Sequence, residues 1–239
     1  MNSIWLPPPN QLKLSPNQVD IWQADLDLSA QQLAQFQLTL STDEQQRAER
    51  FRFDRDRNQY IAGRGILRTL LGQYLNLTPQ QLKFSYSDKG KPALSNTSFT
   101  QPIQFNLSHS YQKAIYAITL NDRVGIDLEY IREIEALSLA KRFFSDYEYL
   151  QLTAFPEPEQ QYLFFQLWTA KEAYLKATGE GLIGLEQIEI SLKTMQLFSV
   201  NSPKKLLSNW SILPLNVDDH YIASIAIEAE NLEYRYLQW

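Results

Sequence analysis

The spacing of apolar and polar positions divides the chain into alternating strand-like and helix-like segments. Residues 19–24 alternate enough between apolar and polar side chains to predict a strand. Residues 58–75 carry isoleucine and leucine at helical spacing, and residues 160–177 are predicted to form a second long helix. Further strands are expected over residues 82–86, 103–107, 114–120, 123–129, 188–192, 210–215 and 221–227, and further helices over 42–50, 137–144 and 146–152.

Capping and turn residues mark the ends of these segments. The short polar side chains at residues 42–44 can accept the free amides of a first helical turn. Prolines break the chain at Pro156 and Pro158, and glycines at Gly179 and Gly181 end the second long helix. The three strands within residues 103–129 are joined by short polar turns, which predicts an antiparallel meander.

The order of predicted elements repeats loosely along the chain. Arg50-Phe51-Arg52-Phe53 precedes one long helix and a strand, and Arg142-Phe143-Phe144 precedes the other. We therefore expect a proline-rich extended arm at residues 1–17, followed by two similar halves at 18–120 and 121–239. The predicted fold class is α+β, a pseudo-twofold arrangement of two α/β halves with a ligand site in the cleft between them.

Composition narrows the chemistry that such a cleft can perform. The 239 residues include no cysteine and two histidines, which excludes thiolate catalysis and disfavours a zinc site built from histidines. The net charge of −5 argues against a general nucleic-acid binder. The sequence has neither an apolar run of membrane-spanning length nor a signal-peptide pattern, so we expect no membrane association and a cytoplasmic location.

Two carboxylates stand two positions apart in an apolar segment, Val124-Gly125-Ile126-Asp127-Leu128-Glu129. Residues two apart on a strand share a face, so Asp127 and Glu129 point the same way. Two carboxylates on one face suit a hard cation such as Mg²⁺, which also takes water and substrate phosphate as ligands. The alternative is an edge strand with a solvated acidic face.

A third carboxylate lies on the second long helix, within Trp168-Thr169-Ala170-Lys171-Glu172-Ala173-Tyr174-Leu175-Lys176. Glu172 and Lys176 are four residues apart and share a helix face, which is equally the pattern of an ordinary surface ion pair. Lys171 points about a quarter turn away from the face that Glu172 and Lys176 share. It could still reach a bound phosphate along the floor of a cleft.

Other polar segments could contact phosphate. Phe105-Asn106-Leu107-Ser108-His109-Ser110 ends a predicted strand with hydroxyl and imidazole groups, and its pattern is not that of a serine hydrolase. Arg64 lies between two glycines inside the first long helix, where close packing explains the glycines as well as ligand approach does. The basic turn Lys89-Gly90-Lys91-Pro92 lacks the spacing of a nucleotide-binding P-loop.

Four of these motifs, in this order, resemble those of the 4′-phosphopantetheinyl transferases of the surfactin-synthetase-activating type. That family has a Gly-Lys-Pro turn, a Phe-Asn-x-Ser-His-Ser run, a Gly-Ile-Asp-x-Glu strand and a Trp-x-x-Lys-Glu-x-x-x-Lys helix. The corresponding residues are 90–92, 105–110, 125–129 and 168–176. The resemblance covers nearly the whole chain and implies two fused halves with coenzyme A in the cleft.

The resemblance also implies roles for individual residues. It places Mg²⁺ on Asp127, Glu129 and Glu172, and assigns Lys171 and Lys176 to the pyrophosphate and the reacting centre. The contacts that it implies for the phosphates and adenosine of coenzyme A are Arg47, Arg64, Lys91, Ser108 and His109. One departure is Glu44, which stands where the family often has a basic residue.

The implied reaction moves phosphopantetheine from coenzyme A to a serine of an apo acyl or peptidyl carrier protein and releases 3′,5′-ADP. Glu172 is the expected base, acting directly or through a metal-bound water, and Lys176 is the expected counter-charge. We expect a monomer, with the carrier docking on residues 141–150. The alternatives are a non-catalytic coenzyme A or nucleotide-binding module and an interaction scaffold with a solvated acidic face.

Overall fold

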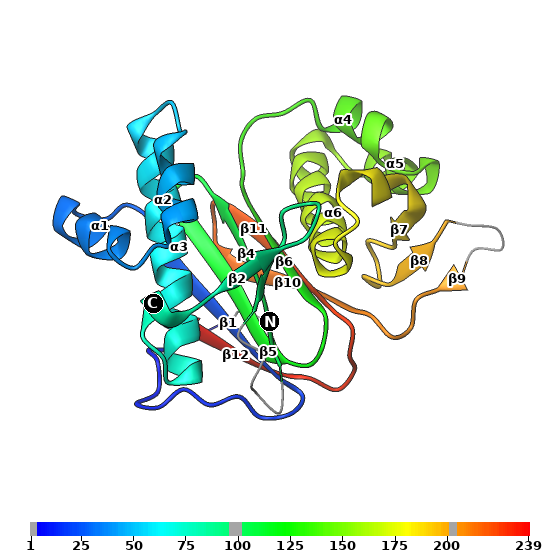
Figure 1. Ribbon diagram of the computed structural model, residues 1–239. Helices are drawn as coiled ribbons and strands as arrows, with labels where there is room; N and C mark the ends of the chain where they lie inside the picture. The colour runs from blue at the N-terminus through cyan, green and yellow to red at the C-terminus, as the bar shows by residue number, and fades with distance from the viewer. Residues whose placement is uncertain (1–3, 96–101, 201–204) are drawn as a thin grey trace.

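One mixed and one antiparallel sheet, each accompanied by one long helix, form the body of the protein (Figure 1). The computed structural model describes residues 4–95, 102–200 and 205–239. The strands of the first sheet, in spatial order, are β12 (Glu233–Gln238), β1 (Gln18–Asp25), β5 (Lys113–Leu120) and β4 (Ile103–Ser110). Those of the second sheet are β10 (Ser211–Asp218), β11 (Tyr221–Ile227) and β6 (Val124–Tyr130).

The two halves repeat the same order of elements, except that the second has one additional short strand, β9. The first half runs β1, α1 (Ala30–Gln37), α2 (Thr42–Glu49), α3 (Asp54–Leu75), η1 (Pro79–Gln81), β2 (Phe84–Tyr86), β3 (Pro92–Leu94), β4 and β5. The second runs β6, α4 (Ala136–Phe143), α5 (Asp146–Thr153), α6 (Glu157–Thr178), η2 (Leu182–Gln187), β7 (Ile188–Ile190), β8 (Leu197–Ser199), β9 (Lys205–Leu206), β10 and β11. The repeat confirms an α+β fold built from two similar halves.

The phenylalanine motifs that suggested the repeat do not occupy equivalent places. Residues 50–53 lie between α2 and α3, whereas residues 142–144 lie at the end of α4, one helix earlier in the order. The last strand also departs from the repeat, because β12 joins the first sheet parallel to β1. Ahead of β1, residues 4–17 form no helix, and Leu6 forms a bridge with Leu237 of β12.

The predicted three-strand meander is wrong at its last strand. β4 and β5 form the expected antiparallel hairpin, but β6 pairs with β11 in the other sheet. Both edges of β5 are already occupied, by β1 and β4, so β6 cannot pair with β5. Its apolar side chains at Val124, Ile126 and Leu128 instead enter a core shared by the two sheets, together with Ile21 and Ile115 of the first sheet.

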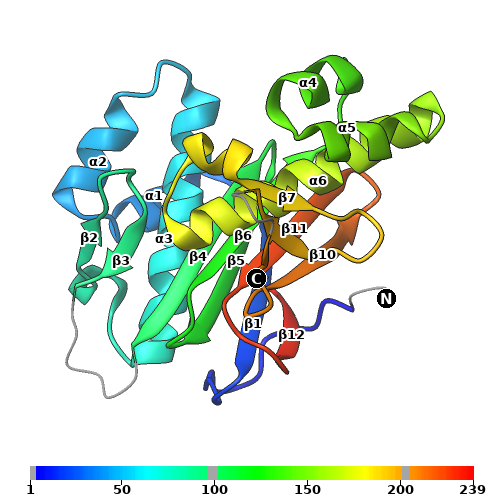
Figure 2. The same cartoon turned by 90° about the vertical axis from the view of Figure 1, so that its right-hand side faces the viewer.

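The two 22-residue helices begin earlier than the apolar pattern predicts. α3 starts at Asp54, where acidic side chains in the first turn favour the positive end of the helix. α6 starts at Glu157 and accommodates Pro158 in its first turn, where backbone amides have no helical partner. It ends at Gly179, which adopts the left-handed conformation (φ 80°) of a helix C-terminus. In Figure 2, α6 lies across the second sheet.

Candidate active site

The three predicted carboxylates gather where β6 meets α6. Asp127 and Glu129 share a strand face with Gly125, and this face is turned toward α6. A Cβ atom at Gly125 would lie 2.0 Å from the Ala173 carbonyl oxygen, so only glycine lets the helix approach the strand this closely. Glu172 belongs to the same stretch of α6, and its ionisation responds to the charges of Asp127 and Glu129.

The floor of the site is formed by two edge strands that lie side by side without a backbone ladder. β4 is the edge of the first sheet and β6 is the edge of the second. Alternate side chains of β4 bridge the gap: Asn106 Oδ1 accepts the Ile126 amide at 2.9 Å, and Ser110 Oγ accepts the Tyr130 amide at 3.0 Å. Between them, Ser108 Oγ donates to Asp127 Oδ1 at 2.9 Å.

The Phe-Asn-x-Ser-His-Ser run therefore has a structural function that sequence reasoning missed. It satisfies the free amides of β6, which would otherwise be left as unpaired donors at the edge of a sheet. The signal was present in the sequence. Asn106, Ser108 and Ser110 are spaced two apart and so share one strand face, while His109 points to the other.

Lys176 is the cation that faces the carboxylates. Its Nζ lies 2.6 Å from Asp127 Oδ1 and 2.8 Å from Ser108 Oγ. Burial, followed by the charge of Asp127, raises the pKa of Glu172 to about 7 despite the opposing effect of Lys176. Burial and the charge of Asp127 also raise the pKa of Glu129. One ammonium therefore does not balance the negative charge of the site.

Two buried carboxylate oxygens among the described residues have no hydrogen-bond partner, Asp127 Oδ2 and Glu172 Oε1. A buried acceptor without a partner is costly, and an unpaired buried charge is more so. The described parts of the chain hold no closed group of three or more acidic, histidine or cysteine side chains ready to surround a metal. The donors nevertheless fit a hard cation that also takes ligands from water or substrate.

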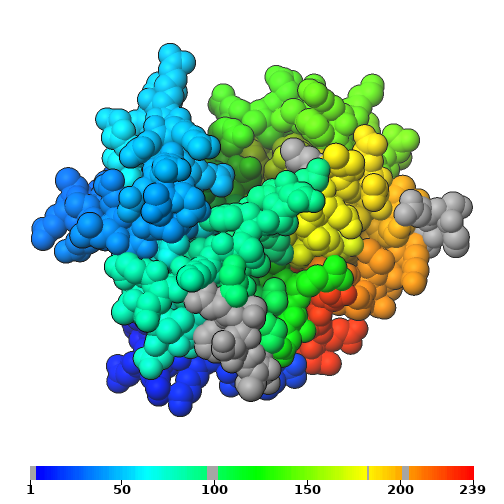
Figure 3. All heavy atoms as spheres, viewed as in Figure 1, coloured from blue at the N-terminus to red at the C-terminus, as the bar shows by residue number. Residues whose placement is uncertain are grey.

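Two cavities meet at Lys176, in the hollow between the blue N-terminal and the green and yellow C-terminal segments in Figure 3. One, of about 230 Å³, is lined by Gly90, Asn106, Leu107 and Glu172 among others. The other, of about 310 Å³, extends toward the N-terminal half, where its lining includes Arg47, Phe51, Tyr60, Arg64, Ser108 and His109. Glu172 thus lines one of two adjoining cavities, together with Lys91, and Arg47 and Arg64 line the other.

The second cavity combines cationic with aromatic side chains. Arg47 places its guanidinium 5.6 Å from the centre of the Tyr60 ring. Partial burial and the nearby Lys176 ammonium lower the pKa of His109, so its imidazole is neutral at pH 7 and can donate one hydrogen bond and accept another. Such a recess suits a ligand that combines phosphate groups with a flat ring.

The prediction that Lys171 faces a bound pyrophosphate is wrong. Its side chain is fully buried, and Nζ donates to Glu148 Oε2 at 2.7 Å and to the Ile188 carbonyl at 2.9 Å. Successive residues on a helix are about 100° apart, so Lys171 turns into the core while Glu172 lines the cavity.

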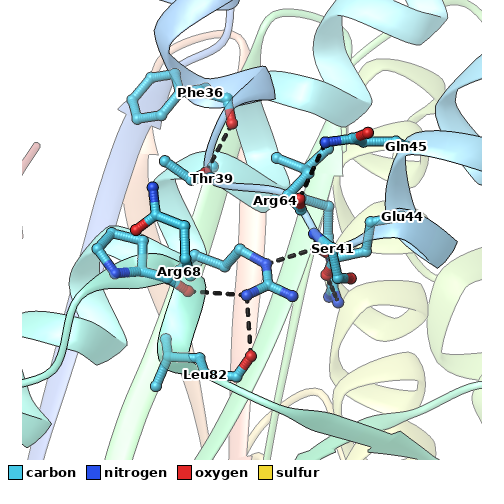
Figure 4. A network of polar contacts seen from close by, with 12 residues as sticks. Phe36, Thr39, Ser41, Glu44, Gln45, Arg64, Arg68 and Leu82 are labelled. Carbon is cyan, nitrogen blue, oxygen red and sulfur yellow. Dashed lines mark hydrogen bonds and ion pairs between the residues drawn. The ribbon is translucent and has the colours of Figure 1, made fainter.

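Glu44 is a structural carboxylate rather than a missing phosphate contact. It is 1% exposed and binds Arg64 Nη2 at 2.5 Å and Arg68 Nε at 2.6 Å, and these arginines help to lower its pKa against the effect of burial. Arg68 also donates to the carbonyls of Pro79 and Leu82 (Figure 4). Glu44 is shared between two guanidinium groups, so this cluster keeps one net positive charge, and Arg64 also lines the second cavity.

This arrangement is the counterpart of Lys171 and Glu148 in the other half. Glu44 and Glu148 each accept the amide of the N-cap serine at the start of α2 and α5. Arg68 and Lys171 each lie fourteen residues after the first residue of their long helix. Each also donates to a backbone carbonyl beyond that helix. The repeated Ser-x-x-Glu pattern was the signal that could have identified both pairs.

Lys91 lies beside the first cavity, but its ammonium is engaged elsewhere. Nζ donates to the Ala177 carbonyl at 2.9 Å and to the Val124 carbonyl at 3.3 Å. Burial lowers its pKa to about 8. The predicted contact with phosphate would require these two bonds to be given up.

The predicted carrier dock is partly core. Phe143 and Phe144 pack on Trp168, and Phe144 also stacks on Phe164 with ring centres 5.1 Å apart. Within residues 141–150, the large apolar side chains left exposed are Tyr147 and Leu150. Across the described residues, no helix combines the length and apolarity that a bilayer crossing requires.

Comparison with known proteins gives consistent matches in both halves. A family model described as the 4′-phosphopantetheinyl transferase superfamily matches residues 123–226. A second, described as the N-terminal part of 4′-phosphopantetheinyl transferase, matches residues 24–120.

Individual relatives extend the match over the chain. The 4′-phosphopantetheinyl transferase HetI of Nostoc sp. is 45% identical over 226 residues, which cover 93% of each chain. The 4′-phosphopantetheinyl transferase Sfp of Bacillus subtilis is 30% identical over 75% of this chain and 78% of its own. The L-aminoadipate-semialdehyde dehydrogenase-phosphopantetheinyl transferase of Mus musculus is 26% identical over 79% of this chain and 67% of its own.

Proposed function

The chain belongs to the 4′-phosphopantetheinyl transferase superfamily, and from that premise we propose how its cleft transfers phosphopantetheine to carrier proteins. The donor is coenzyme A, and the acceptor is a serine hydroxyl of an apo acyl or peptidyl carrier. The serine oxygen forms a bond to the phosphorus that bears the pantetheine arm. The bridging bond to the other phosphate breaks, and 3′,5′-ADP leaves.

The observation that carries this proposal is the pair of unsatisfied buried oxygens on Asp127 and Glu172. With Glu129 they would hold Mg²⁺, whose presence would relieve the repulsion that raises the pKa of Glu129 and Glu172. When bound, the metal would supply charge neutralisation for the pyrophosphate. The enzyme is therefore proposed to be magnesium-dependent.

Each of the other proposed steps of the reaction is assigned to a side chain of the site. Glu172 takes the proton of the attacking serine hydroxyl, because a serine is a weak nucleophile without a base. Lys176, whose Nζ binds Asp127 Oδ1 and not the unpartnered Oδ2, would offset the negative charge that grows on the departing phosphate. Ser108, which touches both Asp127 and Lys176, orients this pair.

The cationic cavity receives the other end of coenzyme A. Arg47 and His109 contact its phosphate and adenosine groups, with the Tyr60 ring as one wall and Arg64 behind it. Because both halves of the cleft come from one chain, a monomer is sufficient for activity.

Incubating the protein with coenzyme A, Mg²⁺ and an apo carrier, then weighing the carrier, tests this function. We expect the mass of one phosphopantetheine arm to be gained and the gain to be abolished by a chelator. Glu172→Gln and Asp127→Ala should each lose on the order of a hundredfold in rate, the scale measured for one lost stabilising group. Binding of coenzyme A without transfer would instead indicate a non-catalytic binding module. Near-normal turnover in either variant would refute its assigned role.

A further inference from the structure

The turn between β2 and β3 is shared by both cavities of the cleft. Gly90 and Pro92 line each of them. Within the turn, the Gly90 amide donates to the Ser87 carbonyl at 2.8 Å, and the Lys91 amide donates to Ser87 Oγ at 3.1 Å. Any movement of this hairpin would therefore change the shape of the whole recess.

The strands of the hairpin are attached to the N-terminal half. Arg64 Nη2 donates to the Tyr86 hydroxyl at 2.7 Å, and the Phe84 ring packs edge-on against Phe105 with ring centres 5.7 Å apart. The hairpin has only two strands, pairs with no other strand in the described residues, and is largely exposed. A hairpin of this size is not stable alone in water, so its position depends on such side-chain contacts.

The tip of the hairpin is attached to the C-terminal half through one ammonium. Lys91 Nζ donates to the Ala177 carbonyl in the last turn of α6 and to the Val124 carbonyl at the start of β6. Carbonyls in the last turn of a helix have no helical partner and carry partial negative charge, which favours a cation there. The two carbonyls belong to the elements that carry Glu172 and Asp127.

We propose that Lys91 is a positioning residue, which fixes the hairpin wall of the cleft against the strand and helix that carry the catalytic carboxylates. In this role its ammonium binds the protein rather than a phosphate. The part of the inference that concerns coenzyme A affinity rests on the proposed function. The position of the hairpin itself is a property of the ligand-free protein.

Lys91→Met tests the role, because methionine keeps the apolar stem and removes the donors. We expect the amides of residues 84–94 to exchange with solvent about tenfold faster in the ligand-free protein, since local opening governs exchange. We also expect KM for coenzyme A to rise about tenfold while kcat at saturating coenzyme A stays within about twofold, a loss equivalent to ~1.4 kcal/mol of binding. Lys91→Gln serves as the second variant should the methionine variant fail to fold.

Lys89→Met is the matched control, because it removes an exposed ammonium from the same turn. We expect its hairpin amides to exchange as in the wild type. A raised KM in Lys91→Met with unchanged exchange would mean direct contact with phosphate and would overturn the proposal. Equal amide exchange in the wild type and both variants would also overturn the proposal. The exchange measurement needs no transfer activity, so absence of transfer by the wild type would refute the proposed function and leave this test intact.

Discussion

Two glutamates in this protein show how neighbouring groups decide what a buried carboxylate does. Glu44 has both oxygens bound by arginines and a backbone amide, and these partners lower its pKa. Glu172 has one oxygen without any partner and two carboxylates nearby, and its pKa rises to about 7. The first arrangement stabilises the fold, whereas the second is incomplete until a cation or a proton arrives.

This difference predicts how the stability of the metal-free protein depends on pH. The pKa of Glu172 is raised above its ordinary value of 4.5, so the folded state holds the proton more tightly than the unfolded state. The stability that this proton contributes is complete below pH 4.5 and is lost as the pH rises through about 7. In chelator, Glu172→Gln should therefore be more stable than the wild type at pH 8, by on the order of 1 kcal/mol.

Thermal unfolding of both proteins between pH 5 and pH 8 checks this expectation. The difference in Tm should grow with pH and should shrink when Mg²⁺ is added, because the metal stabilises only the wild type. A difference that does not change with pH would mean that Glu172 ionises normally in the folded protein.

At the scale of elements, the site depends on how closely α6 approaches β6. β6 forms no backbone ladder along the edge that faces β4. There, side chains of β4 accept hydrogen bonds from the amides of Ile126 and Tyr130 instead. On the face toward α6, Gly125 allows the backbone of residues 173–177 to lie directly against the strand. Glu172 and Asp127 are close for that reason, and the geometry of the site is set by packing rather than by a loop.

Gly125→Ala should therefore damage both stability and activity. The new methyl group would meet the Ala173 carbonyl and the Ala177 backbone, which cannot move aside as a side chain would. We expect a loss of about 3 kcal/mol in the free energy of unfolding, the scale of overpacking, and a fall in kcat in the folded protein. Denaturant unfolding and transfer assays measure the two effects.

Gly63→Ala is the control for stability, since its Cβ would have no neighbour closer than the Tyr116 hydroxyl at 3.9 Å. It should stabilise α3 by up to about 1 kcal/mol through helix propensity. A neutral Gly125→Ala would contradict the close approach of α6 to β6.

At the scale of the whole molecule, local patterns predicted elements well and their pairing less well. The strands at residues 19–24 and 114–120 lie where the sequence pattern predicted them, and so do both long helices except for their earlier starts. The strand partner of β6 could not be predicted from the sequence. The short turn before β6 shows that it follows β5 closely along the chain, but it does not show which sheet has a free edge for β6 to join. Lys171 was misassigned for a related reason: its partner Glu148 lies 23 residues away and became visible only in the folded chain.

A buried ion pair is present at the equivalent place in each half, so matched variants can compare what the two pairs contribute to stability. Lys171→Met leaves Glu148 buried without its cation, which should cost about 3–5 kcal/mol of stability. Arg68→Met in the other half leaves Glu44 with Arg64 as its remaining arginine and should cost less. Denaturant unfolding measures both, and adding Glu148→Gln to Lys171→Met should recover part of the loss.

Activity separates this structural pair from the site itself. The folded fraction of Lys171→Met should keep KM for coenzyme A and kcat close to those of the wild type, because its ammonium does not reach the cleft. Lys176→Met should lose transfer in the folded protein, since Lys176 faces the carboxylates, and should cost less stability than Lys171→Met because Lys176 is partly exposed. If Lys171→Met had the stability of the wild type but transferred poorly, Lys171 would instead contact the pyrophosphate, and its structural role would be refuted.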